Sequence, residues 1–392
     1  MKAPGKTFSS VDEYYIDQCL QLAKLGEGLV SPNPMVGAVV LDKDGRRVAE
    51  GYHQRAGGPH AEVLALDQAG ERARGGTLYV NLEPCNHHGK TPPCTQAIIA
   101  AGIERVICGT LDPNPEVSGA GRDELQNARI SVRYGFLEEA CLRLNESFFH
   151  YITTRHPFVT LKLGLTMDGK IAARNGSSQW ITGPLARQFV HHLRNRYDAI
   201  LTTAETVIAD DPALTVRDVP MLRDPEDGRR KQPTRVILDR QCRLSFNHYQ
   251  VFDTHQAPTW VFVSGLRATP EYLAMARGRN VRITEVDDTG LGLNMKEVLY
   301  HLGQGGITSV MVEAGGRLAG HLLSMGLANK VYLFYGPQVL SDPMARGAFS
   351  NAVNLQLPQA PRLHFAHTRR LNKDLLVEAY PDKRTTALMK TL

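Results

Sequence analysis

The chain has 392 residues, of which 42% are hydrophobic and 22% are charged. These fractions exclude a wholly disordered chain, and the length suits two or three domains of about 150 residues. The net charge of +5 is a weak basic excess, which does not by itself indicate a nucleic-acid or membrane partner. No apolar run approaches the roughly 18 residues of a transmembrane helix, and residues 1–10 lack the apolar core of a signal peptide. We therefore expect a cytoplasmic protein whose six cysteines are free or metal-bound rather than paired in disulfides.

The first part of the chain reads as alternating helices and strands. Ser10 and Glu13 form a capping-box pattern ahead of apolar residues at helical spacing, which predicts a helix that ends near Gly26. The turn Asp44-Gly45 lies between two strand-like segments and predicts a hairpin. By residue range, we expect strands at 36–41, 47–52, 77–82 and 105–110, helices at 60–73, 95–101 and 138–151, and a loop at 112–115.

A second set of alternating elements begins near Pro157. Strand–helix alternation predicts an α/β domain with a largely parallel sheet. The most polar stretch, residues 218–232, is expected to be an exposed loop inside this domain. We therefore expect two domains, at residues 1–153 and 157–392. In the second, strands are predicted at 158–163, 199–202, 235–238, 260–263 and 309–312, and helices at 184–195, 270–276, 295–302 and 318–325.

The strongest chemical signal is His60-Ala-Glu62, followed by Cys85 and Cys94. One histidine and two cysteines make three zinc ligands, and a catalytic zinc site keeps its fourth position for water. A glutamate two residues after the ligand histidine is typical of zinc nucleobase deaminases, in which it transfers protons and is not a ligand. Zinc lowers the pKa of water from 15.7 to about 7, so hydroxide can attack the amine-bearing ring carbon at neutral pH. We therefore predict one Zn²⁺ held by His60, Cys85 and Cys94, with Glu62 as the catalytic acid–base.

The spacing of the two cysteines departs from the usual Cys-x-x-Cys. Eight residues separate Cys85 from Cys94, and this insert contains His87, His88 and Lys90. Two alternatives stay open: a closed structural zinc site with His87 or His88 as fourth ligand, and a cluster without metal.

Several motifs together closely resemble the family of bifunctional deaminase/reductases of riboflavin biosynthesis. The long insert between the cysteines is itself a feature of that family. The motifs stand at residues 32–37, 51–57, 59–62, 82–94, 112–115, 161–164, 168–170, 178–182, 210–217 and 312–315, and so cover nearly the whole chain. The chain departs from the family pattern at Ala120, where a basic residue is common, and at Arg129, where a glycine is usual. Neither position touches the zinc ligands, so only local loop contacts are in doubt.

The resemblance implies an N-terminal domain like cytidine deaminase, with three layers, and a C-terminal α/β domain like dihydrofolate reductase. The first would hydrolyse the 2-amino group of 2,5-diamino-6-(5-phosphoribosylamino)pyrimidin-4-one. The second would reduce the ribosyl group with NADPH, giving 5-amino-6-(5-phosphoribitylamino)uracil. The implied partners are these phosphorylated small molecules, with neither nucleic acid nor membrane, and a homo-oligomer, dimer or tetramer, is expected.

Five residues are predicted to bind the substrate of the deaminase. Asn33 lies between two prolines, which stiffen its backbone and suit an amide that hydrogen-bonds a pyrimidine edge. A plain turn asparagine is the alternative. His53, His87, His88 and Lys90 are candidate donors to the substrate phosphate, because several cationic groups near one metal cluster favour an anion site.

In the second domain, residues 313–320 follow a predicted strand and open a helix, where small residues would let backbone amides approach a phosphate. This stretch does not match the dinucleotide-binding pattern Gly-x-Gly-x-x-Gly, so the motif alone is weak evidence for a phosphate site. The resemblance implies that the cofactor contacts Gly164, Trp180, Thr206, Asp210, Gly315, Gly316, Arg317, Leu318, Ala319, Gly320 and His321. It implies that the substrate contacts Ser178, Arg194, Leu214, Arg217 and Glu313.

Four side chains of that domain have a physical rationale of their own. Arg194 and Arg217 are predicted phosphate clamps because the guanidinium offers a planar fork of donors. An exposed helix arginine is more often just solvated, so the prediction for Arg194 rests mainly on the resemblance. Arg240 follows a predicted strand and is expected to meet the 2′-phosphate of NADPH. Trp180 would stack on the nicotinamide or simply fill the core.

Two other function classes compete with this interpretation. A nucleic-acid base deaminase with a C-terminal binding module predicts a basic groove interleaved with aromatic residues, whereas the basic run here is limited to residues 229–231. A non-enzymatic protein stapled by zinc predicts four protein ligands. Metal content and NADPH consumption would separate all three.

Overall fold

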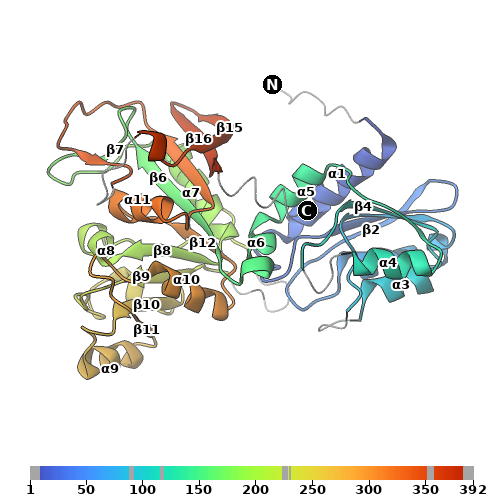
Figure 1. The fold of residues 1–392 in the computed structure, drawn as a ribbon, viewed down its shortest axis with the longest axis horizontal. Coiled ribbons are helices and arrows are strands. Elements are labelled where there is room, and N and C mark those ends of the chain that lie inside the picture. The colour runs from blue at the N-terminus through green and yellow to red at the C-terminus, as the bar shows by residue number, and fades with distance from the viewer. Residues whose placement is uncertain are drawn as a thin grey trace. The chain divides into compact units, whose positions relative to one another are not determined.

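A computed structural model of the chain describes residues 9–87, 92–114, 119–222, 228, 231–350 and 357–382. The chain divides into two compact units, and the division falls between Thr154 and Arg155 (Figure 1). Within the described ranges, no helix is both long enough and apolar enough to cross a membrane.

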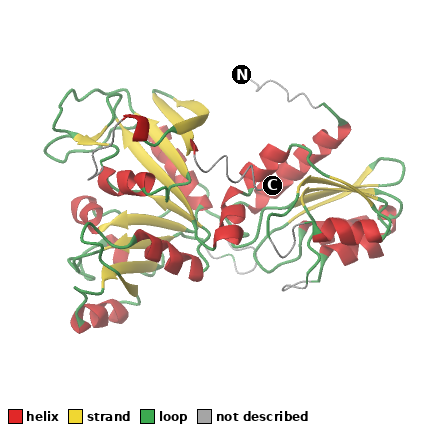
Figure 2. Cartoon of the chain, in the orientation of Figure 1, coloured by secondary structure: helices red, strands yellow, loops and turns green. Residues whose placement is uncertain are grey.

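The first unit is built on a five-stranded sheet of order β2-β1-β3-β4-β5. Strands β1 and β2 form the predicted antiparallel hairpin, β3 pairs antiparallel with β1, and β3, β4 and β5 run parallel (Figure 2). Every residue of β1 and β3 is buried, because helices cover both faces of the sheet. The strands are β1 Gly37–Leu41, β2 Arg47–Tyr52, β3 Thr77–Leu82, β4 Arg105–Thr110 and β5 Ser131–Arg133.

Helices α1 and α5 lie on one side of this sheet, and α3 and α4 on the other (Figure 1). The predicted cap of α1 is confirmed, since the Ser10 hydroxyl accepts a hydrogen bond from the Glu13 amide. Gly51 in β2 allows the strand to approach α2 closely, because a Cβ there would lie 2.6 Å from the carbonyl oxygen of Ala61. The helical segments are α1 Val11–Ala23, η1 Lys24–Gly26, α2 Ala61–Ala69, η2 Gly70–Ala73, α3 Cys94–Ala100, α4 Ala120–Asn127, α5 Glu138–Leu144 and α6 Glu146–Thr154.

The predicted helix at 138–151 is in fact two helices, α5 and α6, which meet at Asn145. The Asn145 side chain is buried and hydrogen-bonds both backbone groups of Met35, accepting from its N–H and donating to its carbonyl. The break therefore places an amide against the segment that enters β1.

The second unit contains a nine-stranded sheet of order β11-β10-β9-β8-β12-β6-β13-β16-β15. The first seven strands in this order run parallel, as predicted, and β16 and β15 close one side as an antiparallel pair. The strands are β6 Phe158–Leu165, β8 Ala199–Thr203, β9 Thr234–Leu238, β10 Thr259–Ser264, β11 Arg282–Val286, β12 Ser309–Val312, β13 Lys330–Tyr335, β15 Leu363–Leu371 and β16 Asp374–Pro381.

Alternate residues of the central strands feed two apolar cores, one on each face of the sheet. In β12, Val310 and Val312 join the core that includes Leu302 of α10, whereas Met311 joins the core that includes Leu193 of α7. The remaining elements are β7 Lys170–Ala172, α7 Pro184–Arg196, α8 Ala204–Asp210, η3 Gln250–Phe252, α9 Pro270–Gly278, α10 Met295–Gln304, α11 Gly316–Ser324, β14 Arg346–Gly347 and η4 Leu357–Gln359. Both units are thus mixed α/β layers, and the predicted fold class is confirmed.

Candidate active sites

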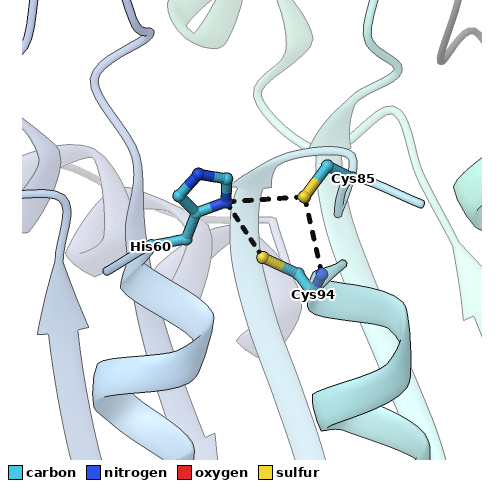
Figure 3. A group of neighbouring side chains, drawn as sticks. All are labelled: His60, Cys85 and Cys94. Atoms are coloured by element: carbon cyan, nitrogen blue, oxygen red, sulfur yellow. Dashed lines mark hydrogen bonds between the residues drawn. The ribbon is translucent and has the colours of Figure 1, made fainter. Parts of the chain in front are cut away.

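The three predicted metal ligands converge from three different segments (Figure 3). His60 is the N-cap of α2, Cys85 follows β3, and Cys94 opens α3. The His60 Nδ1 atom lies 3.1 Å from the Cys94 Sγ and 3.4 Å from the Cys85 Sγ. Among the described residues, this is the one group of three or more side chains with its ligand atoms within 4.8 Å of one another.

This cluster fits a zinc ion in both geometry and chemistry. With Zn–N near 2.1 Å and Zn–S near 2.3 Å, tetrahedral ligation separates the nitrogen and sulfur atoms by roughly 3.6 Å. The two distances from His60 Nδ1 to the cysteine sulfurs, 3.1 and 3.4 Å, are close to this value. Hydrogen bonding from Cys94 and His60 lowers the pKa of the Cys85 thiol to about 4, despite its burial, while the same contact raises the pKa of Cys94. A thiolate, the form that binds metal, is therefore already favoured at Cys85.

Glu62 lies in the first turn of α2, beside the ligand cluster. Its side chain is buried, and the Oε2 atom has no hydrogen-bond partner among the described residues. Burial raises the pKa of this carboxyl to about 7, with the charge of His60 opposing the shift. A buried carboxyl that exchanges its proton near neutral pH suits general acid–base work.

Of the three candidate residues in the insert between Cys85 and Cys94, the structure describes one, His87. His87 is exposed and does not belong to the ligand cluster, so it supplies no fourth ligand in this structure. His88 and Lys90 lie outside the described residues.

Asn33 and His53 contact each other next to the metal cluster. The His53 Nδ1 atom lies 3.0 Å from the Pro59 carbonyl oxygen and so carries a proton, which leaves Nε2 to accept from the Asn33 amide at 3.1 Å. Burial lowers the pKa of His53. Both ring nitrogens are thus engaged within the protein, and His53 orients Asn33 here rather than presenting a cationic donor to a phosphate.

On the second unit, the carboxyl ends of three neighbouring parallel strands gather the predicted ligand residues. Gly164 lies near the end of β6, Thr206 follows β8 in α8, and Glu313 and Gly315 follow β12. This edge is where parallel α/β sheets bind their ligands.

A buried ion cluster stands at the centre of that edge. The Arg194 guanidinium donates to both carboxylate oxygens of Glu313, at 2.7 and 3.1 Å, and the Lys162 ammonium lies 3.6 Å from the same carboxylate. Burial would raise the pKa of Glu313, but the two cations lower it to about 2. Arg194 is 8% exposed, so the solvated-arginine alternative is wrong, and its charge is directed to Glu313.

The glycines of α11 have a packing role that the sequence did not suggest. A Cβ at Gly316 would lie 2.2 Å from the Gly347 carbonyl oxygen, and one at Gly320 would lie 2.3 Å from that of Ser350. These two glycines therefore allow the backbone of residues 347–350 to pack directly against α11. Gly315, the N-cap of α11, is exposed and has open space around it, which leaves the amide end of the helix accessible to a phosphate.

The other predicted residues differ in accessibility. Trp180 is 60% exposed with Arg187 over its ring, so the core-filling alternative is wrong. Arg217 and Asp210 are exposed, whereas the Leu214 side chain is buried in the core and only its backbone could meet a ligand. The half-buried members are Ser178, Thr206, Leu318 and His321; Arg317 is exposed and Ala319 is buried.

Comparison with known proteins decides between the function classes. Residues 157–377 match the RibD C-terminal domain family, and residues 9–110 match the cytidine and deoxycytidylate deaminase zinc-binding region. The riboflavin biosynthesis protein RibD of Escherichia coli is 42% identical over 369 residues, which cover 93% of this chain and 98% of that protein. That of Aquifex aeolicus is 44% identical over 337 residues, which cover 86% and 90%.

Solved structures agree. Acinetobacter baumannii RibD superposes with a TM-score of 0.83 at 37% identity, covering 94% of this chain and 98% of that one. The deaminase/reductase of Thermotoga maritima superposes with a TM-score of 0.80 at 40% identity, with the same coverage.

The chain belongs to the RibD family. It is a bifunctional deaminase and reductase of riboflavin biosynthesis, with a zinc-dependent N-terminal domain and an NADPH-dependent C-terminal domain. The predicted family, activity class and cofactors are confirmed.

Within this RibD-family chain, Arg240 behaves differently from the expectation. Its guanidinium is bound bidentately by Asp288, at 2.8 and 2.7 Å, and also donates to the Gly290 carbonyl. The Nε and Nη2 donors of Arg240 are thus already used within the protein, which leaves Nη1 as the part of the guanidinium fork for a 2′-phosphate.

Two site-adjacent residues are absent from the sequence predictions. Lys162 contacts Glu313, and a lone lysine inside an apolar strand is a signal that could have found it. Asp112 is buried, which raises its pKa to about 7, with the charges of Glu83 and Cys85 adding to the shift. Nothing in the local pattern marks Asp112 as buried, because its segment reads as a turn.

Proposed function

We propose that this chain catalyses two consecutive reactions on one phosphorylated pyrimidine. The first is hydrolytic deamination of 2,5-diamino-6-(5-phosphoribosylamino)pyrimidin-4-one. The second is reduction of the deaminated ribosyl compound to 5-amino-6-(5-phosphoribitylamino)uracil. The convergence of His60, Cys85 and Cys94 beside the buried, unpaired carboxyl oxygen of Glu62 carries the first assignment.

In the deaminase, each residue has a distinct task. Zinc held by His60, Cys85 and Cys94 would supply the Lewis acidity that brings the pKa of water near 7. Glu62 accepts the proton of the attacking water and returns protons to the ring nitrogen and to the departing ammonia. Asn33, oriented by His53, hydrogen-bonds the pyrimidine edge. His87, with His88 and Lys90 outside the described residues, is assigned to the phosphate.

In the reductase, NADPH supplies the hydride. We assign its phosphates to the start of α11, from Gly315 to His321, and its remaining contacts to Gly164, Trp180, Thr206 and Asp210. The substrate lies against Ser178, the backbone of Leu214 and the ion cluster of Arg194 and Glu313. Arg217 is exposed and binds the substrate phosphate as a forked donor.

The decisive experiment follows both reactions on the same purified protein. Given the diaminopyrimidinone, the protein should release ammonia and then oxidise NADPH. Given the deaminated compound, it should oxidise NADPH with no ammonia release. A chelator that removes zinc should abolish ammonia release from the diaminopyrimidinone. It should spare the oxidation of NADPH with the deaminated compound. Failure of either substrate to produce its signal would refute the corresponding half of the proposal.

We also propose a cytoplasmic homo-oligomer, dimer or tetramer. All six cysteines are free, which suits a reducing compartment. The edge strand β15 is long and largely exposed, with Phe365 66% exposed, and such an edge invites pairing with another chain. Light scattering of the purified protein measures the assembly, and a monomer at micromolar concentration would exclude it.

A further inference from the structure

The segment between α8 and the polar loop, residues 211–218, has an unusual backbone. It forms no helix or strand, yet three of its residues adopt left-handed conformations: Asp211 with φ 37°, Leu214 with φ 51° and Asp218 with φ 58°. Such conformations cost of order 1–3 kcal/mol each for residues other than glycine, so they persist only where the surroundings impose them.

Side chains from outside the segment impose that conformation by bonding its backbone. Arg194 donates to the Thr215 carbonyl at 2.9 Å, and the ring of His191 accepts from the Arg217 amide at 3.3 Å. The most complete of these contacts belongs to Gln232. Its Oε1 accepts from the Val216 amide at 2.8 Å, and its Nε2 donates to the Val216 carbonyl at 3.2 Å.

The Val216 side chain is buried, so this residue faces the core while its two backbone groups are held by Gln232. The next residue, Arg217, has an exposed side chain, and its acidic neighbour Asp218 lies 3.8 Å away with 77% of its side chain exposed. An ion pair this exposed contributes little, so the Arg217 guanidinium is available to an anion. Arg217 follows Val216 directly, so its side chain leaves the backbone between two tethers, Gln232 on Val216 and His191 on the Arg217 amide.

We propose that Gln232 is a positioning residue of the reductase. By holding both backbone groups of Val216, it fixes the direction in which Arg217 presents its guanidinium to the substrate phosphate. The inference rests on the proposed function, in which Arg217 binds that phosphate. Gln232 itself touches neither substrate nor cofactor.

The test compares Gln232→Met, Gln232→Glu, Arg217→Ala and the double variant Gln232→Met with Arg217→Ala. Methionine keeps the length of the side chain and removes both hydrogen bonds, whereas glutamate keeps the acceptor for the Val216 amide. The matched control is Gln256→Met, because Gln256 lies in the same unit and its side chain bonds the exposed carboxylate of Asp253. NADPH oxidation is measured with the deaminated ribosyl phosphate, varying each substrate in turn.

Gln232→Met should raise the KM for the ribosyl phosphate roughly ten-fold, the lower end of the effect of losing the charge-assisted contact between Arg217 and the phosphate. The kcat and the KM for NADPH should stay unchanged, and Gln232→Glu should fall between wild type and Gln232→Met. In the Arg217→Ala background, Gln232→Met should have no further effect, because the residue that it positions is gone. The control should behave as wild type.

Any of three outcomes would overturn the inference. The first is an unchanged KM for the ribosyl phosphate in both Gln232 variants. The second is a full, multiplicative effect of Gln232→Met in the Arg217→Ala protein. The third is an equal rise in the KM for NADPH, as expected of a general packing role. If wild type fails to oxidise NADPH with the deaminated compound, the proposed function falls and the inference with it. If wild type is active and Arg217→Ala raises the KM while Gln232→Met does not, the inference alone falls.

Discussion

The carboxyl of Glu62 combines two conditions that a proton-transferring group needs. It stands beside the cluster of ligand atoms, and burial raises its pKa above the usual carboxyl range, which eases the return of a proton to the substrate. The neighbouring α2 residues Ala61 and Ala65 are fully buried, which holds this turn in place.

Replacing Glu62 by Gln should therefore keep the zinc but slow deamination by about 10²–10⁴-fold, because an amide cannot accept the proton of water. Ammonia release measures the rate, and metal analysis measures the zinc. Glu71→Gln is the matched control, since Glu71 lies in the same unit with 92% of its side chain exposed. Near-normal turnover by zinc-replete Glu62→Gln would remove the role assigned to this residue.

Ligand identity can be tested by metal content alone. Cys85→Ser and Cys94→Ser should each lose zinc, because a hydroxyl does not replace a thiolate ligand. His87→Ala and His88→Ala should retain it, and Cys242→Ser in the other unit serves as control. A metal-free His88→Ala protein would instead support a closed structural zinc site with His88 as the fourth ligand.

Glu313 should make the reductase unit sensitive to acid. Its folded pKa, about 2, lies below its ordinary value of 4.5, so its ion pairs stabilise the fold fully above pH 4.5. That contribution, about 3 kcal/mol, is lost as the pH falls from 4.5 towards 2. Glu313→Gln should be less stable than wild type at pH 7, and the difference should shrink through this window. Urea unfolding at a series of pH values tests this; a constant difference would contradict it.

At the scale of elements, a close approach between β2 and α2 places the ligands. Gly51 faces Ala61 and Ala65 of α2, and a Cβ there would lie 2.6 Å from one backbone atom and 2.9 Å from another. Since His60 and Glu62 stand at the start of this helix, any shift of α2 moves both of them.

Gly51→Ala should accordingly lower both the stability of the deaminase unit and its zinc content. Gly45→Ala is the control, because Gly45 has open space around it and costs only the left-handed penalty of its φ of 79°, about 1–2 kcal/mol. Thermal unfolding and metal analysis compare the two. Full zinc occupancy in Gly51→Ala would show that α2 tolerates displacement.

Predictability from sequence also varies by element. The hairpin of β1 and β2 and five of the seven parallel strands of the second sheet carry strong local signals, namely Asp44-Gly45 and buried apolar runs, and they were predictable. The parallel strands β11 and β13 were not among the predictions. The split of α5 from α6 was not, because it depends on a bond from Asn145 to the distant Met35. Strand β15 is largely exposed on both faces, so no alternation marks it. The zinc cluster needed only residue types and spacing, whereas the pairing of Arg240 with Asp288 needed the fold.

At the scale of the whole molecule, the two sites draw on separate parts of the chain. The deaminase residues end at Cys94 in sequence and the reductase residues lie after Phe158, and the two units each have their own sheet. The sites should therefore act independently.

Glu62→Gln should still oxidise NADPH when supplied with the deaminated compound, and Arg217→Ala should still release ammonia. The latter should bind the ribosyl phosphate more weakly by about 1.5–3 kcal/mol, the usual contribution of a hydrogen bond to a charged group. Both assays on both variants make the test. Loss of NADPH oxidation in a folded Glu62→Gln protein would contradict independence.

The position of β6 has a consequence for the protein as it is synthesised. All strands of the first unit lie within residues 37–133, so its sheet can close early. Strand β6 opens the second unit, yet both of its neighbours, β12 and β13, lie at residues 309–335. At roughly 5–20 residues per second, this apolar strand waits on the order of ten seconds with two unpaired edges. A nascent chain that stalls before β12 therefore carries one finished domain, β6 with both edges unpaired and β8 with the edge that β12 would cover unpaired.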